Sequence, residues 1–124
     1  MIKLVFTLRR REGMSREEFQ HYWLEKHGPL VRQHAATLHI RRYVQVHRHE
    51  TAANDALAAQ RGCQPAFYDG VAELWWDSLE DLAAVMSDPA AQAAGQELLE
   101  DEARFIDLAH SPLWLGQEHE VVGT

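Results

Sequence analysis

Cysteine and basic residues are both scarce in this 124-residue chain. Cys63 is its only cysteine, which excludes an internal disulfide and a zinc site built from several cysteines. Lys and Arg number 12 against 19 Asp and Glu, giving a formal net charge of -7. We therefore expect no nucleic-acid partner, because binding a phosphate backbone requires a basic surface.

Long apolar runs are absent as well. No segment approaches the roughly 20 apolar residues of a membrane span, so no membrane partner is expected. The apolar N-terminal run is short and arginines follow it, the reverse of a secretion signal. The sequence thus predicts a cytoplasmic protein. Its apolar and charged fractions, 46% and 25%, are typical of one globular domain, which we expect to span residues 1–124.

Strands are predicted where apolar and polar residues alternate, at residues 2–8, 39–49 and 67–77. Residues 106–122 predict an irregular fourth strand, and its Pro112 is expected at a sheet edge or at a bulge. Residues 48–64 show no clear apolar period, which indicates a long loop that could contain one Ala-rich turn. We expect this loop to act as a lid over a pocket.

Helices are predicted from their first residues. Ser15 and Glu18 form a capping-box pattern, and Gly28-Pro29 is expected to end or kink this helix just after His27. Asp77 or Ser78 should cap a second helix, and Asp88 before Pro89 a third segment. The acidic "ELLEDE" at residues 97–102 is expected on the solvated side of that last segment.

The element order βαββαβ predicts an α+β fold, a ferredoxin-like antiparallel sheet with its helices on one face. The first and third strands carry large apolar residues on both faces. The face without helices would then be bare. A second copy of the chain would cover it, so the pattern predicts a homodimer.

His27 is the strongest candidate for a catalytic residue, because imidazole exchanges protons near neutral pH. The alternative is that it only caps a helix end. Tyr43 could bind or protonate a substrate oxygen, and Gln45 and His47 lie on the same strand face as Tyr43. Three aromatic residues are either pocket walls or core: Trp23, Phe67 and Trp76. His47 and His49 have no third ligand at a nearby spacing, so we predict no metal site.

Four segments resemble the EthD-like branch of the dimeric α/β-barrel superfamily: "MIKLVFTLRR", "MSREEFQHYWLEKHGPLV", "RYVQ" and "YDGVAELWWDSLEDL". The resemblance implies a homodimer whose two sheets pack into a barrel. It also implies a pocket between sheet and helices in each subunit, with His27 beside it. Relatives act on small hydrophobic or aromatic molecules, often without metal or organic cofactor.

These observations predict a small-molecule enzyme that performs cofactor-independent proton transfer on an aromatic or lactone-like substrate. Elimination, isomerisation and oxygenation are the possible outcomes. His27 would be the general acid or base, and Tyr43 would orient a substrate oxygen. The alternative is a non-catalytic accessory or ligand-binding protein in an oxidation pathway, and a third possibility is a structural dimer without a pocket.

Overall fold

A four-stranded antiparallel sheet forms the centre of the computed structural model, which describes residues 1–64 and 66–123. The spatial order of its strands is β2-β3-β1-β4. The strands are β1 (Ile2–Leu8), β2 (Arg42–His47), β3 (Gly70–Trp76) and β4 (Leu113–Gln117). β4 begins directly after Pro112 and lies at an edge of the sheet, as the proline predicts.

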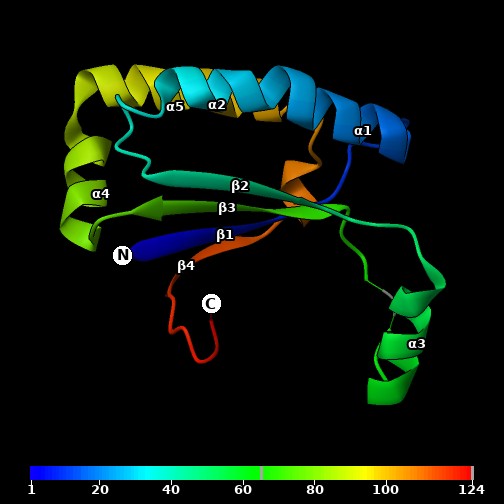
Figure 1. The fold of residues 1–124 in the computed structure, drawn as a ribbon. Coiled ribbons are helices and arrows are strands. Elements are labelled where there is room, and N and C mark those ends of the chain that lie inside the picture. Colours follow the sequence, from blue (N-terminus) through cyan, green and yellow to red (C-terminus); the bar gives the residue numbers. More distant parts are fainter. Residues whose placement is uncertain (65, 124) are drawn as a thin grey trace.

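The main helices cover one face of this sheet (Figure 1). They are α1 (Arg16–Tyr22), the π-helical η1 (Trp23–His27), α2 (Gly28–His34) and α5 (Pro89–Glu102). α4 (Leu79–Ser87) lies at one end of the sheet, and a short 3₁₀ turn, η2 (Leu108–His110), precedes β4. The predicted α+β, ferredoxin-like architecture is confirmed.

Side-chain caps fix where the helices begin. The Ser15 hydroxyl accepts a hydrogen bond from the Glu18 backbone N–H at 3.1 Å, and the Glu18 carboxylate accepts one from the Ser15 N–H at 3.1 Å. This confirms the predicted capping box. Ser78 caps α4 and Asp88 caps α5, each accepting from a backbone N–H three residues later.

Gly28-Pro29 was expected to end or kink the helix, and the expectation that the helix ends there is wrong. The helical backbone continues from α1 through η1 into α2, and the Gly28 N–H donates to the Trp23 carbonyl across the wider π turn. A π turn of this kind adjusts the helix locally, and here it directly precedes Pro29, which has no N–H to donate. His27 therefore lies inside a continuous helical segment and does not cap a helix end.

Residues 48–64 differ from the predicted loop, because α3 (Ala52–Arg61) forms within them. The Thr51 hydroxyl caps its start, and Gly62 ends it in the left-handed conformation with φ of 63°. None of the residues of α3 is buried. The helix projects from one end of the sheet, on the side away from α1 and α5 (Figure 1).

The core between helices and sheet consists of two clusters of buried side chains. The first joins β1, β3, α1, η1 and the segment after α5: Phe6, Leu8, Phe19, Trp23, Ala72, Phe105 and Ile106. The second joins α2, the turn after it, α4 and α5: Val31, Leu38, Val85, Ala91, Ala94 and Leu98. Tyr43 packs against both clusters, so its side chain lies at their junction.

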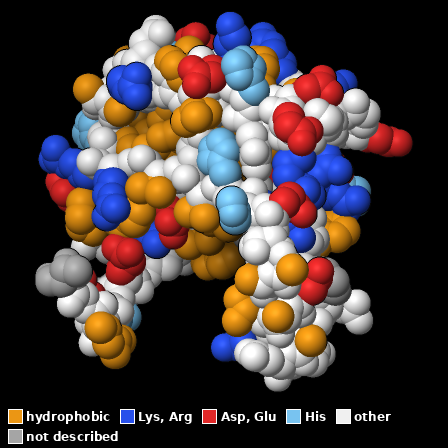
Figure 2. Space-filling view, turned by 45° about the vertical axis from the view of Figure 1, so that its right-hand side comes forward, with side chains coloured by type: hydrophobic (Ala, Val, Ile, Leu, Met, Phe, Trp, Pro, Cys, Tyr) orange, Lys and Arg blue, Asp and Glu red, His pale blue; other side chains and the backbone are white. Residues whose placement is uncertain are grey.

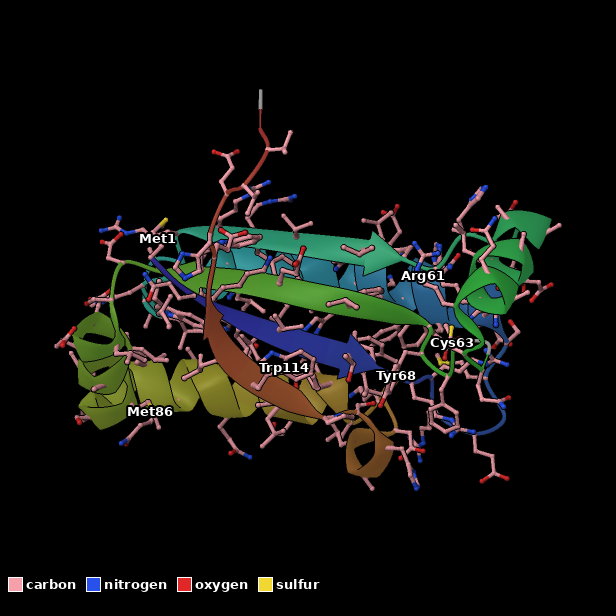
Figure 3. All side chains as sticks on the ribbon, turned by 90° about the horizontal axis from the view of Figure 1, so that it is seen from below. Met1, Arg61, Cys63, Tyr68, Met86 and Trp114 are labelled. Carbon is pink, nitrogen blue, oxygen red and sulfur yellow. The ribbon has the colours of Figure 1, made fainter. Side chains whose placement is uncertain are left out.

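In the part of the chain that the structure describes, no layer of helices covers the outer face of the sheet, the face opposite α1 and α5. Figure 2 shows a hollow beneath the sheet, between α3 on one side and the C-terminal segment on the other. Trp114 on β4 (Figure 3) pairs with Val5 in the β1–β4 register and is 52% exposed. Val46 on β2 is 47% exposed. In the described part of the chain, no helix is both long and apolar enough to cross a membrane.

Candidate functional site

Strand register places the polar face of β2 beneath the helices. Tyr43 pairs with Leu74, Gln45 with Ala72 and His47 with Gly70, and directly paired residues share one face of a sheet. Ala72 has a small side chain and Gly70 has none, so space remains above β3 for groups from the helices, such as the Trp23 ring.

A cavity of about 40 Å³ lies between the two core clusters. This inner cavity is as large as one water molecule or one small substituent of a ligand. Its walls are mostly apolar, and three titratable side chains reach it: His27 from η1, Tyr43 from β2 and Glu102 from α5. Such a grouping of titratable residues in a mostly apolar site is typical of a catalytic centre.

His27 is 4% exposed, and its Nδ1 lies 2.8 Å from Asp101 Oδ2. Burial lowers the pKa of His27, although the Asp101 carboxylate acts to raise it. The imidazole is therefore neutral at pH 7. No side chain among residues 1–64 and 66–123 forms a hydrogen bond with Nε2.

Asp101 holds the imidazole in one orientation. Its Oδ1 accepts hydrogen bonds from the Tyr22 hydroxyl at 2.6 Å and the Arg104 guanidinium at 2.9 Å. Burial alone would raise the pKa of Asp101, but hydrogen bonds from Tyr22, His27 and Arg104 lower it overall. An ionised Asp101 accepts the Nδ1–H of His27, which leaves a lone pair on Nε2.

The Tyr43 hydroxyl is positioned by two donors. Trp23 Nε1 donates to it at 3.2 Å and Gln45 Nε2 at 2.9 Å. Both lone pairs of the phenolic oxygen are then used, so the Tyr43 O–H can only donate to a further partner. Burial raises the pKa of Tyr43, which keeps this proton in place at neutral pH.

Gln45 connects the π turn to β2. Its Nε2 donates to the Trp23 carbonyl at 2.8 Å, and its Oε1 lies 2.7 Å from His47 Nε2. The His47 ring stacks on Trp23, with ring centroids 4.4 Å apart. The π turn therefore supplies both His27 and the carbonyl that fixes Gln45, which in turn fixes Tyr43.

Glu102 is the third titratable group of the inner cavity. Burial, and after it the charge of the adjacent Asp101, raises the pKa of Glu102 to about 7. Asp101 and Glu102 are sequence neighbours, yet one is ionised against His27 while the other exchanges its proton near neutral pH. Two carboxyl groups in different environments can thus take different roles.

A larger cleft of about 470 Å³ lies between α2 and β2. Val31 and Tyr43 line both this cleft and the inner cavity, so the two spaces adjoin there. The cleft is lined by Leu24, Gly28, Val31, Arg32, Ala35, Ile40, Arg41, Arg42, Tyr43, Gln45 and His47. Its size suits a compact ligand that extends one group toward His27.

The structure brings five of the predicted site residues together: Trp23, His27, Tyr43, Gln45 and His47. Two others lie elsewhere. Phe67 is 56% exposed and stacks beneath the Arg9 guanidinium, 3.7 Å from its ring centre. Trp76 is buried and donates from Nε1 to the Leu38 carbonyl at 2.8 Å. Neither residue lines the cleft or the inner cavity.

Asp101 and Glu102 were missed, because "ELLEDE" was expected on the solvated side of its helix. The prediction is wrong for Asp101, which is 6% exposed. The helical spacing from Ala91 and Ala94 through Leu98 to Asp101 was the available signal, because it continues one buried stripe.

Residues 48–64 line neither the cleft nor the inner cavity, so the predicted lid is not part of our proposal. Within residues 1–64 and 66–123, no three His, Cys, Asp or Glu side chains are grouped to hold a metal ion.

Comparison with known proteins identifies the family. The EthD domain model matches residues 11–109. A protein of Claviceps purpurea (strain 20.1) named "Decarboxylase" is 27% identical over 117 residues, covering 91% of this chain and 79% of that protein. The chain therefore belongs to the EthD domain family.

Solved structures share the fold. An EthD family protein from Bacillus halodurans C-125 superposes with a TM-score of 0.64 at 18% identity, covering 96% of this chain and 99% of that one. A protein from Bacteroides fragilis NCTC 9343, described as dimeric with a ferredoxin-like fold, gives a TM-score of 0.58 at 13% identity, covering 94% and 95%. At these identities the likeness shows the fold alone.

Proposed function

We propose that this chain is an enzyme of small-molecule metabolism that uses its own side chains to transfer protons on a compact aromatic or lactone-like substrate. The observation that carries the proposal is the buried His27, oriented by Asp101 beside a cavity that it shares with Tyr43. The substrate lies in the cleft between α2 and β2 and extends its reacting group into the inner cavity.

His27 acts as the general base in this proposal. Its neutral imidazole carries the proton on Nδ1, so Nε2 can accept a proton from a substrate carbon or hydroxyl. Asp101 then stabilises the imidazolium that forms. Tyr43 donates its hydroxyl proton in a hydrogen bond to a substrate oxygen, where negative charge develops.

Isomerisation, elimination and cofactor-independent oxygenation share a first step in which an enol or enolate forms. Decarboxylation, suggested by the name of the Claviceps relative, also depends on proton transfer. There, a ring carbon takes up a proton, the bond to the carboxylate breaks, and its electron pair returns to the ring as CO₂ leaves. We propose the proton-transfer class and leave the particular reaction to experiment.

The proposal includes a homodimer formed through the outer face of the sheet. Its support is the exposure of Trp114 and Val46 there, at 52% and 47%, and the dimeric state given for the Bacteroides protein of the same fold. Exposed large apolar side chains on one face are typical of a protein–protein interface.

The proposal is tested with three probes in D₂O: 1-tetralone, α-angelica lactone and 2,4-dihydroxybenzoate. Mass spectrometry follows deuterium uptake or product formation. We expect activity on at least one probe and a loss of roughly 100-fold or more in His27→Gln.

His34→Gln is the matched control, because His34 pairs with Glu97 at 2.9 Å across α2 and α5 but lies outside the inner cavity. It should retain full activity. Equal rates in His27→Gln and the wild type would contradict the proposal. Probes that bind and are recovered at unchanged mass would favour the alternative of a non-catalytic binding protein.

A further inference from the structure

Glu102 is the one titratable group of the inner cavity that the reaction proposed above does not use. It lies on the last turn of α5, next to Asp101, and lines the cavity with His27 and Tyr43. No hydrogen bond joins its carboxyl group to another side chain within residues 1–64 and 66–123. A carboxyl group held in a mostly apolar cavity without a fixed partner is available to a ligand.

We propose that Glu102 is a second catalytic residue, which delivers a proton to the substrate oxygen while His27 removes one from carbon. This inference rests on the proposed function, because it assigns a second group to the same site. It also names the class of substrate: a carbonyl compound, ketone or lactone, with an acidic C–H bond next to the carbonyl group.

The proposed step balances. His27 Nε2 takes the proton of the C–H bond, and the electron pair of that bond forms a carbon–carbon double bond. The carbonyl π electrons move to oxygen, which takes the Glu102 proton and becomes an enol hydroxyl. His27 ends protonated and Glu102 ionised, so the site carries no net change in charge.

Tyr43 is less suited to supply this proton. Its oxygen accepts hydrogen bonds from Trp23 and Gln45, and burial raises its pKa from an already high value of about 10. The pKa of Glu102, about 7, is matched to neutral pH, where a general acid is most effective. Tyr43 therefore orients the oxygen and Glu102 protonates it.

The groups around Glu102 support its role as the proton donor, separate from that of Tyr43. His27 from η1 and Tyr43 from β2 are the other titratable residues of the cavity, and Asp101 is its charged neighbour on α5. β1 and β3 contribute only apolar side chains to the cavity: Phe6, Leu8, Ala72 and Leu74. Among the residues that the structure describes, no Lys or Arg side chain lines the cavity to hold Glu102 ionised.

The experiment compares Glu102→Gln with the wild type in two measurements. The first is deuterium uptake by 1-tetralone and α-angelica lactone in D₂O between pH 5 and pH 9. We expect the wild-type rate to fall above about pH 7, and the variant to be roughly 30-fold or more slower at pH 6 without that fall. The second is carbon-13 NMR of the glutamate carboxyl groups, which needs no substrate.

In the NMR titration we expect one carboxyl signal with a midpoint near pH 7, lost in Glu102→Gln. Glu100→Gln is the matched control, since Glu100 is exposed and only accepts a hydrogen bond from Gln96. It should keep both the signal and the wild-type rate.

The outcomes separate the two proposals. If His27→Gln abolishes uptake while Glu102→Gln retains the wild-type rate and pH profile, the role of Glu102 is overturned and the proposed function stands. If His27→Gln retains full activity, the proposed function itself fails. A Glu102 carboxyl group that titrates near its ordinary value of about 4.3 overturns this inference without any substrate.

Discussion

Gly70 on β3 and Trp23 in the π turn are in direct contact. A Cβ atom added to Gly70 would lie 2.6 Å from Trp23 Cζ3 and 2.6 Å from the Val46 carbonyl oxygen. Trp23 in turn donates to Tyr43 and stacks on His47. Because Gly70 has no side chain, the Trp23 ring can lie directly against β3 at this position.

Gly70→Ala should destabilise the fold, because an added methyl group in a closely packed core costs about 1–3 kcal/mol. Urea denaturation measures the loss. Gly95→Ala is the control, since Gly95 lies inside α5 and an added Cβ would meet no described atom within 4 Å beyond its chain neighbours and its own helix backbone. That variant should gain about 0.5–1 kcal/mol. Equal stability in the two variants would contradict the packing described for Trp23.

Asp101→Asn should lower turnover strongly while the protein stays folded. The amide cannot carry the charge that stabilises a protonated His27, so we expect turnover to fall roughly 100-fold or more. The loss of charge-assisted hydrogen bonds should cost about 1–3 kcal/mol, measured in urea.

Glu97→Gln is the control for this change, because Glu97 pairs with His34 in a solvent-accessible position. It should change both stability and activity little. If Asp101→Asn kept full turnover, Asp101 would be only a structural partner of His27.

Glu102 should make stability depend on pH. Its pKa is about 7 in the fold and about 4.3 in an unfolded chain, so the folded state binds more protons between these values. The contribution of Glu102 to the free energy of unfolding therefore falls as pH rises from about 4.3 to 7. Glu102→Gln should melt several degrees above the wild type at pH 8 and close to it at pH 4.5.

His27 has the opposite effect. Burial lowers its pKa in the fold, so its contribution is present above about pH 6.5 and is lost as pH falls through the folded value. The contribution of His27 to stability is the same in the wild type and in Glu102→Gln. It therefore cancels when the melting temperatures of the two proteins are subtracted. A melting difference independent of pH would show that Glu102 is not held in its protonated form.

Trp114→Glu should dissociate the proposed homodimer, since it places a charge in the apolar part of the outer face. Light scattering at micromolar concentration should give the mass of a dimer for the wild type and of a monomer for the variant. Met86→Glu is the control, because Met86 is 68% exposed but lies on α4, away from this face (Figure 3). A monomeric wild type would contradict the dimer.

Local patterns predicted the framework of the fold. Alternation located the strands, and Ser15, Ser78 and Asp88 located the helix starts, because both signals lie within a few residues of the element they define. The prediction that Tyr43, Gln45 and His47 line one wall is also local, because these residues alternate on a single strand.

The parts that local patterns missed depend on contacts between distant segments. Asp101 lies 74 residues from His27, and nothing in "ELLEDE" indicates which carboxylates the fold will bury. Gly28-Pro29 is typical of a helix end, yet the helix continues through a π turn in which the Gly28 N–H donates to the Trp23 carbonyl. His27 was thus found for its chemistry, whereas Asp101 and Glu102 had to be located from the tertiary structure.

Nitrogen-15 NMR of histidine-labelled protein tests the central claim most directly. In the wild type at pH 7, the signal lost in His27→Gln should show a neutral imidazole protonated on Nδ1, with a pKa below 6.5, and its Nε2 should shift when 1-tetralone is added. An imidazole protonated on Nε2, with an ordinary pKa and no response to any of the three probes, would identify His27 as a structural residue and contradict the account.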